Sequence, residues 1–327
     1  MAENKVIYEY LGRLEGHNGS VTTLVVGKND DGSPLLISGG RDKNIIVWKL
    51  NLNEPEDIKD NEQKVIDHKV GKPIKSLHGH NHFISSIALS DDNKKLISGS
   101  WDKTIRLWDL PTSSCQRLFK GHDKDVLAVS FSHDYRLIFS GGMDNSLIYW
   151  NNEGVSKYKN DSFEGWVSSI INIKKGKENF MAVGSWDSKV RIFDSQYELN
   201  RTIEGNGYAV ISMSSDDEGD YLFVAYKDGT IKVWNLKGSK NTEDICKRTI
   251  ETNVNINTIN FQSKYFQFYA IGTNKGLQLR EIRTGKIYDT KIYVPCNAIA
   301  YDPSKTYLFA GYSDGVIRVF RVVSDSN

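Results

Sequence analysis

One eleven-residue phrase recurs along this chain, and it constrains the fold more than any other feature of the sequence. It consists of a small residue, glycine, two variable residues and aspartate, followed by alternating apolar residues that end in tryptophan or phenylalanine. Its aspartate positions lie 39 to 47 residues apart, except for the first two, which lie 60 apart. A repeat of this period indicates a row of similar structural units. Six good copies, and a weaker one with Lys275 at the aspartate position, are SGGRDKNIIVW (38–48), SGSWDKTIRLW (98–108), SGGMDNSLIYW (140–150), VGSWDSKVRIF (183–193), VAYKDGTIKVW (224–234), IGTNKGLQLRE (271–281) and AGYSDGVIRVF (310–320).

Each phrase predicts part of a small antiparallel sheet. The stretch before it alternates apolar and polar residues, as in HDKDVLAVSFS (122–132), which is typical of a half-buried strand. A turn such as SHDYR or DPSKT follows, and then an apolar strand that ends at the glycine, the aspartate turn, and the strand with the tryptophan. A polar fourth strand fits the segments that come next, for example PIKSLHGH (73–80), CQRLFKGH (115–122) and LNRTIEGN (199–206).

Seven four-stranded units predict an all-β fold, a seven-bladed β-propeller. A single four-stranded sheet cannot bury both of its faces, whereas sheets stacked around an axis bury them against one another. Residues 8–16 (YEYLGRLEG) look like an outer strand without a preceding unit, so we expect them to complete the last blade, formed by 298–323. This closure leaves no free sheet edge. We therefore expect one domain over residues 1–327, with a charged, solvated insertion at 51–72 between blades one and two.

Composition narrows the possible functions. The 42 lysines and arginines nearly balance the 41 aspartates and glutamates, so any contact with nucleic acid must come from a local patch. The three cysteines, Cys115, Cys246 and Cys296, are too few and too widely spaced for a disulfide framework or a zinc site. The N-terminal sequence lacks an apolar leader, and no apolar segment is long enough to span a membrane. We expect a cytoplasmic protein without membrane insertion.

Histidine, serine and aspartate recur together in the first three repeats, which at first suggests a catalytic triad. An enzyme needs one nucleophile in one cleft, and here the same set appears in blade after blade. We therefore predict no catalytic residue. Instead we predict a structural network in which aspartate contacts histidine, histidine contacts serine, and serine contacts the indole N–H of tryptophan. The alternating His78, His80 and His82 lack further ligands, so we predict no metal and no cofactor. The network residues are His17, Ser38, Asp42, Trp48, His80, Ser98, Asp102, Trp108, His122, Ser140, Asp144 and Trp150.

The Gly-His and Trp-Asp signature at this period resembles that of WD-repeat proteins. Over residues 8–323, the amino-acid sequences of the blades and their order are similar to those of the receptor for activated C kinase family. The strongest phrases are GRLEGHNGSVT, ISGGRDKNIIVWKL, GHNHFISSIALS, LISGSWDKTIRLWDL, KGHDKDVLAVSFS and LFAGYSDGVIRVFRV. G-protein β subunits are related to that family, but no G-protein γ subunit is expected here, because no heptad-patterned helix precedes the first strand.

The resemblance implies a non-catalytic scaffold on the head of the small (40S) ribosomal subunit. Such a scaffold binds rRNA and neighbouring ribosomal proteins through blades one and two. It also implies recruitment of protein kinase C-type kinases and of translation or quality-control factors through the remaining surfaces.

The same resemblance assigns rRNA contacts to the aspartate turn of blade one. Arg41 and Lys43 flank Asp42, and we expect the network to occupy Asp42, so that it does not cancel their charges. We expect this turn to project from the narrow edge of the disc. There, arginine can bind a phosphate through two N–H groups and lysine as a point charge. Further positions that match or neighbour the family's contacts are Lys75, His78, Arg117, Lys120 and Lys124.

Two alternatives stay open on the sequence. Arg41 and Lys43 are also compatible with ordinary solvated turn charges. The whole chain is also compatible with a free cytosolic WD-repeat adaptor, such as a ubiquitin-ligase or trafficking module that uses its central face. The segment before the last blade, 289–298, is short for the receptor family, and blade six has lost its aspartate (Lys275) and its tryptophan (Glu281). We therefore carry over no kinase contact to blade six.

Overall fold

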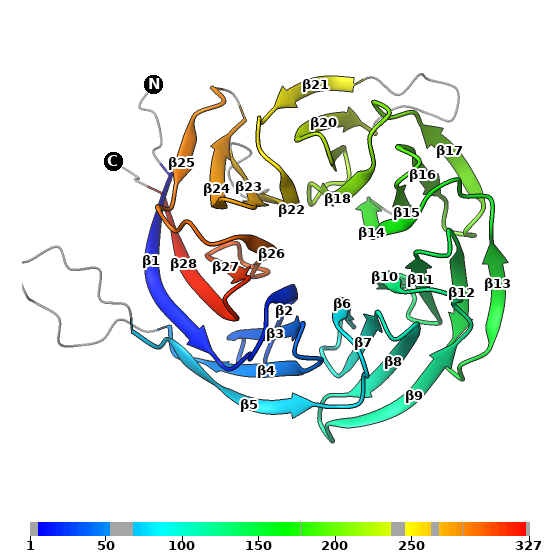
Figure 1. The fold of residues 1–327 in the computed structure, drawn as a ribbon, viewed down its shortest axis with the longest axis horizontal. Helices are drawn as coiled ribbons and strands as arrows, with labels where there is room; N and C mark the ends of the chain where they lie inside the picture. The colour runs from blue at the N-terminus through cyan, green and yellow to red at the C-terminus, as the bar shows by residue number, and fades with distance from the viewer. Residues whose placement is uncertain are drawn as a thin grey trace, which may run out of the picture.

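Seven four-stranded sheets stand around a central axis like the blades of a propeller (Figure 1). The computed structural model describes residues 6–52, 68–176, 178–236, 246–262, 268–282 and 284–324. All regular elements in these ranges are β-strands, and neighbouring strands within each sheet are antiparallel. The innermost strands of successive blades contact one another around the axis. The predicted all-β, seven-bladed propeller is therefore confirmed.

Each of the first six blades uses four consecutive strands, from the axis to the rim. Blades one to three contain β2 (Val21–Lys28), β3 (Pro34–Gly40), β4 (Ile45–Leu50) and β5 (Gly71–Leu77); β6 (Ile84–Leu89), β7 (Lys95–Ser100), β8 (Thr104–Asp109) and β9 (Ser114–Lys120); and β10 (Val126–Phe131), β11 (Leu137–Gly142), β12 (Leu147–Asn151) and β13 (Ser156–Asn160). Blades four to six contain β14 (Val167–Lys175), β15 (Glu178–Ser185), β16 (Val190–Phe193) and β17 (Leu199–Ile203); β18 (Val210–Ser215), β19 (Tyr221–Tyr226), β20 (Thr230–Asn235) and β21 (Cys246–Glu251); and β22 (Ile256–Gln262), β23 (Phe268–Thr273), β24 (Gly276–Glu281) and β25 (Ile287–Asp289).

The last blade joins the two ends of the described chain. Its inner strands are β26 (Cys296–Tyr301), β27 (Tyr307–Tyr312) and β28 (Val316–Ser324), and its outer strand is β1 (Val6–Glu15). The first strand pairs antiparallel with the last along its length, with one irregularity between Tyr10 and Gly12. The expectation that the N-terminal strand closes the last blade is thus confirmed (Figure 1).

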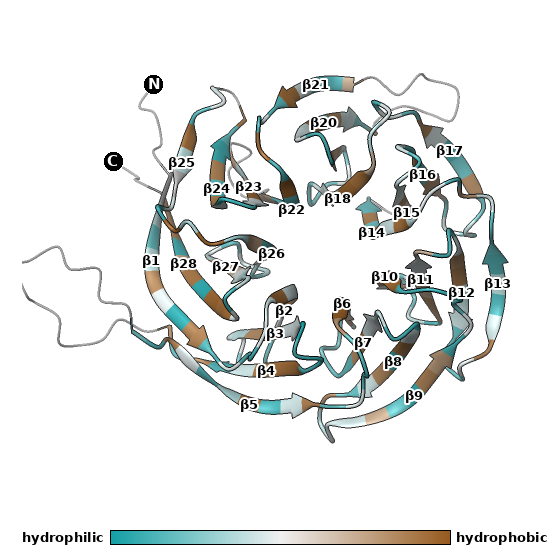
Figure 2. Ribbon diagram, in the orientation of Figure 1, coloured by the Kyte–Doolittle hydropathy of each residue, from teal (hydrophilic) through white to brown (hydrophobic). Residues whose placement is uncertain are grey.

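The hydrophobic core lies between the blades rather than within any one of them. One cluster, for example, joins Ile37 and Val47 of blade one to Ile87, Leu96 and Trp108 of blade two. Figure 2 shows hydrophobic colouring on inner strands such as β22 and hydrophilic colouring on the outer strand β13. Because each interface buries apolar residues from two sheets, a blade depends on both of its neighbours.

The insertion predicted at 51–72, between blades one and two, instead lies between β4 and β5 within blade one, and it also differs from expectation at its C-terminal end. Residues 53–67 of it lie outside the described part of the chain. The N–H of Arg13 donates to the carbonyl of His68 at 2.9 Å, the N–H of Val70 donates back to Arg13 at 3.1 Å, and β5 already begins at Gly71. A Cβ at Gly12, where φ is +146°, would lie 2.4 Å from the same His68 carbonyl oxygen. Residues 68–72 are therefore a paired segment that ties blade one to β1.

Candidate nucleic-acid interface

The structure brings the twelve predicted network residues together in three sets of four. In blade one, His17 Nδ1 lies 2.9 Å from Asp42 Oδ2, and its Nε2 lies 2.7 Å from Ser38 Oγ. The indole N–H of Trp48 donates to the same serine oxygen at 2.8 Å. The same contacts, at 2.7 to 2.8 Å, join His80, Ser98, Asp102 and Trp108 in blade two, and His122, Ser140, Asp144 and Trp150 in blade three.

The network directs the charge of the turn aspartate inward. The side chain of Asp42 is only 6% exposed, and its carboxylate also accepts the backbone N–H groups of Asn18 and Asn44. Burial by itself raises the pKa of Asp42, but the hydrogen bond from His17 and the attraction to its ring outweigh burial and lower the pKa overall. Asp42 therefore stays ionised at neutral pH, with its oxygens occupied by partners inside the blade.

The two cations beside Asp42 face solvent. Arg41 and Lys43 are both exposed, and within the described ranges neither forms an ion pair with a carboxylate. Lys43 has a positive φ of 70°, and Lys103 has the same φ at the equivalent position of blade two. The repeat itself therefore explains the place of Lys43. Arg41 is particular to blade one.

The position of Arg41 corrects one expectation, because it does not project from the narrow edge of the disc. It lines a cavity of about 440 Å³ between innermost strands, and Lys227 of blade five lines the same cavity. The reason is local: the backbone N–H of Arg41 donates to the carbonyl of Ser20 at 2.8 Å, immediately before the innermost strand β2. Arg41, the residue before the turn aspartate, therefore lies toward the central axis. The other lining residues are Thr22, Ile211, Asn255, Ile256, Asn257 and Asn297.

Aromatic side chains adjoin Arg41 on the side of blade two. The guanidinium carbon of Arg41 lies 5.4 Å from the centre of the Phe83 ring. Phe83 packs against Trp101 at 5.4 Å, and Trp101 stacks on the exposed His82 at 5.7 Å between ring centres with an interplanar angle of 20°. Cations beside such faces suit both phosphate groups and unpaired bases.

Sequence reasoning missed Lys227 and the aromatic group of His82, Phe83 and Trp101. A signal for Lys227 was present, because it occupies in the fifth phrase the position of Arg41 in the first. Its ammonium lies 4.5 Å from the centre of the Trp186 ring. Trp101 and Trp186 stand at this same position in the phrases of blades two and four. This position of the repeat therefore places cations and aromatic side chains on one face of the propeller.

The remaining predicted rRNA residues do not form one group. His78 lies beside the turn of blade one, because its Nδ1 is 2.8 Å from Asn44 Oδ1. Lys120 and Lys124 are exposed one blade further on, next to the loop that contains His122. The ammonium of Lys75 instead donates to the carbonyls of Leu110 and Pro111, at 2.6 and 3.1 Å. Arg117 is exposed in the middle of the rim strand β9.

Comparisons with known proteins agree with this geometry. Residues 8–49, 71–109, 113–151, 197–235 and 288–321 match the family described as WD domain, G-beta repeat. The chain is 35% identical to the small ribosomal subunit protein RACK1 of Caenorhabditis elegans, covering 95% of both chains. It is 36% identical to the protein of that name from Drosophila melanogaster, covering 95% of this chain and 96% of the relative, and 34% identical to that from Candida albicans, covering all of both.

The chain belongs to the RACK1 family of WD-repeat proteins. The WD-repeat match leaves out residues 152–196 and 236–287, which contain the inner strands of blades four and six. Both blades nevertheless have four strands in this RACK1-family chain, so the propeller geometry extends beyond the recognisable repeat. A search of the described residues for a helix suited to crossing a membrane found none.

Proposed function

We propose that this chain is a non-catalytic scaffold protein of the small ribosomal subunit head in the cytoplasm. Its relatives carry the name of small ribosomal subunit proteins, and the chain aligns with them over nearly its whole length. The observation that carries the proposal is the aspartate turn of blade one. Two exposed cations flank an aspartate whose carboxylate is already occupied, so their charge is available to a polyanion.

The proposed interface consists of Arg41, Lys43 and His78, with Lys120 and Lys124 at its margin. Arg41 suits a phosphate through two N–H groups, and Lys43 suits a neighbouring phosphate as a point charge. The exposed ring of His82, stacked on Trp101, suits an unpaired base. We leave Lys75 out of this interface, because its ammonium already binds two carbonyls, and Arg117, because it lies on the rim.

Sedimentation through a sucrose gradient tests this proposal. We expect the wild-type protein to sediment with small subunits at low salt, and to be released as salt rises, because phosphate contacts exchange with counterions. The double variant Arg41→Asp with Lys43→Glu should stay in the light fractions. The control is Lys94→Glu with Lys95→Glu, which makes the same charge change at two exposed positions where the β6–β7 turn of blade two meets β7.

Each outcome of this experiment decides one part of the proposal. If the wild-type protein stays in the light fractions at low salt, the ribosomal function is wrong. If the Arg41 and Lys43 double variant still sediments with small subunits, the ribosomal function stands but the assigned interface is wrong. Release of the Lys94 and Lys95 control would show that net charge alone decides binding.

The rest of the propeller is proposed to recruit partners. We propose one rigid domain over residues 1–327, whose surfaces outside blades one and two bind protein kinase C-type kinases and translation or quality-control factors, with no kinase contact assigned to blade six. Pull-down of such kinases from small-subunit fractions would support this part. Limited proteolysis that yields two separately folded fragments would contradict the single domain.

The cavity beside Arg41 favours a second candidate, a free adaptor that binds peptides at its central face. The two cations Arg41 and Lys227 there suit an acidic peptide segment. The variant Lys227→Glu separates the candidates, because Lys227 belongs to the cavity and not to the turn of blade one. If the protein stays in the light fractions and Lys227→Glu loses partner proteins, the free adaptor is supported. If ribosome sedimentation is retained while partner proteins are lost, the protein is the ribosomal scaffold and binds these partners at the cavity.

A further inference from the structure

The turn between the first and second strands of a blade contains a recurring pair of side chains. In blade two, the hydroxyl of Ser90 donates to Asp92 Oδ1 at 2.5 Å. In blade three, the hydroxyl of Ser132 donates to Asp134 Oδ1 at 2.7 Å. The serine oxygen in turn accepts a backbone N–H from the residue five positions later. One hydroxyl and one carboxylate, two residues apart, therefore satisfy each other in these turns.

Blade seven has the same pair in reversed order. There the hydroxyl of Ser304 donates to Asp302 Oδ2, while Asp302 Oδ1 accepts the backbone N–H of Tyr307 at 2.6 Å. The buried first position can therefore hold an aspartate, provided that the third position supplies a hydroxyl to its second oxygen. Asp302 is only 2% exposed.

Blade five has a carboxylate at both positions, Asp216 and Glu218. Asp216 is 3% exposed, and its Oδ1 accepts the backbone N–H of Tyr221 at 2.8 Å, as Asp302 Oδ1 does from Tyr307. Its Oδ2 is fully buried and receives no hydrogen bond within the described part of the chain. The oxygen that a serine hydroxyl satisfies in blade seven thus faces a second carboxylate in blade five.

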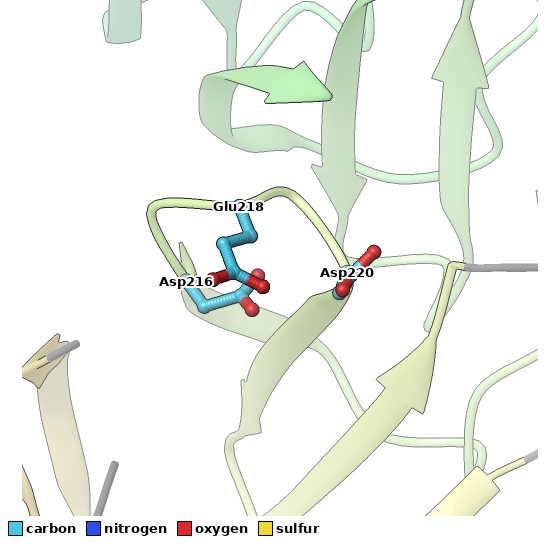
Figure 3. Close-up of side chains that lie close together, drawn as sticks. All are labelled: Asp216, Glu218 and Asp220. Carbon is cyan, nitrogen blue, oxygen red and sulfur yellow. The ribbon is translucent and has the colours of Figure 1, made fainter. Parts of the chain in front are cut away.

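We propose that this turn binds a divalent cation of the calcium type. Figure 3 shows the carboxylates of Asp216 and Glu218 side by side, with Asp220 at the end of the same turn. The ligand oxygens of the three residues all lie within 4.8 Å of one another. Calcium binds oxygen at about 2.3–2.6 Å, so two ligands on opposite sides of one ion lie about 4.6–5.2 Å apart. The spacing therefore suits one calcium ion between them.

One ion pair and one close backbone contact define the surroundings of the turn. Lys305 pairs with Asp217 at 3.7 Å, and Asp217 is not one of the three proposed ligands. Gly219, with φ of +69°, lets the turn pack against the Lys174 carbonyl, where a Cβ would lie 2.4 Å from the oxygen.

Terbium luminescence and calorimetric titration with calcium test the proposal on the full-length protein. We expect saturable binding of one ion with a Kd below about 1 mM, the weak end of oxygen-ligated calcium sites. Glu218→Gln should weaken binding at least about tenfold, because it removes one ligand charge. Asp216→Ser should abolish binding and keep the fold, because it recreates the pair of blades two and three. Asp217→Asn is the matched control, since it removes one charge from the same turn outside the cluster.

The outcomes separate a cation site from a shared proton. Calcium-dependent stabilisation of the wild type in a thermal melt, absent in Asp216→Ser and retained in Asp217→Asn, supports the cation site. No saturable binding by the wild type would overturn it and leave a shared proton between Asp216 and Glu218. Equal weakening by Asp217→Asn and Glu218→Gln would also overturn it, because general negative charge would then explain the binding. The site lies at the opposite end of β19 from the turn that contains Lys227, so ribosome sedimentation tests a different surface.

Discussion

Blades three and four stand side by side, yet they hold the same turn aspartate with different partners. In blade three, Asp144 contacts His122, which comes from the loop before the blade, at 2.8 Å. In blade four, Asp187 forms an ion pair at 2.8 Å with Arg191, four residues further along its own hairpin. Blade seven has the same arrangement as blade four, because Arg318 forms an ion pair with Asp314, four residues earlier. The turn carboxylate is balanced by a histidine contact in blade three and by an arginine ion pair in blade four.

The two arrangements differ in how many strands they join. The histidine of blade three reaches Ser140 and, through it, Trp150, so one chain of hydrogen bonds crosses the blade. Blade four has Val183 and Phe193 at these positions, and its ion pair stays within one hairpin. Serine and tryptophan are therefore lost together with the histidine.

The largest effect that distinguishes the blades should come from the tryptophan. Trp150 is 1% exposed, and Trp150→Ala should lower the free energy of unfolding by ~3–5 kcal/mol, as a large-to-small change in a core. The control is Glu281→Ala, at the same position of the repeat in blade six, which we expect to cost below about 0.5 kcal/mol. Urea unfolding measures both. Equal effects would contradict the assignment of Trp150 to the core.

A smaller effect should come from the serine that links histidine and tryptophan. Ser140→Val leaves the indole N–H of Trp150 without an acceptor and should cost about 1–3 kcal/mol. Combining it with Trp150→Phe recreates the residues of blade four and should cost less than the sum of the two single changes. A double-mutant cycle should give a coupling of about 0.5–3 kcal/mol. Strict additivity would show that the two side chains do not act as one unit.

Acid should lower the free energy of unfolding through blades one to three, whose turn aspartates contact a histidine. Burial raises the pKa of Asp144, but the hydrogen bond from His122 and the attraction to its ring outweigh burial and hold that pKa well below its ordinary value. Such a group contributes stability that is present above its unfolded-state pKa, near 3.9, and is lost as pH falls toward the folded-state pKa. We expect the free energy of unfolding to fall below about pH 4, by up to about 1.4 kcal/mol per pH unit for each proton bound.

The variant Asp144→Asn isolates the contribution of one blade to this acid sensitivity. It should be less stable than the wild type at neutral pH. Its stability should fall less steeply below about pH 4, because the variant has one carboxylate fewer that binds a proton when the chain unfolds. Urea unfolding across this pH range measures the two slopes. Parallel slopes would mean that Asp144 has the same pKa in the folded and unfolded chain.

The smallest effect is expected at the proposed rRNA turn. Arg41 and Lys43 are exposed and outside the network, so Arg41→Asp with Lys43→Glu should change the free energy of unfolding by less than about 0.5 kcal/mol. A thermal melt of the double variant checks this. A large destabilisation would make loss of ribosome sedimentation uninformative, because unfolding alone would then explain it.

The sequence predicted the number of blades and their closure, because the repeat period and the unpaired segment 8–16 are properties of the chain itself. It did not predict the place of Arg41. A repeat shows that a residue belongs to a turn, but the hydrogen bond to Ser20 decides which way the turn faces. Arg191 escaped notice because an arginine in an alternating strand looks like any solvated residue. The carbonyl contacts of Lys75 depend on the neighbouring blade, which no local pattern describes.

The pairing of β1 with β28 has a consequence for synthesis of this protein. A ribosome that makes the chain releases Val6–Glu15 first and Val316–Ser324 last, so the first strand waits for nearly the whole translation time before its partner emerges. During that interval the growing chain presents an open sheet edge, which is an aggregation hazard. A product truncated before the last blade never obtains the partner for that edge. Ring closure thus makes the folded state depend on translation through the last blade.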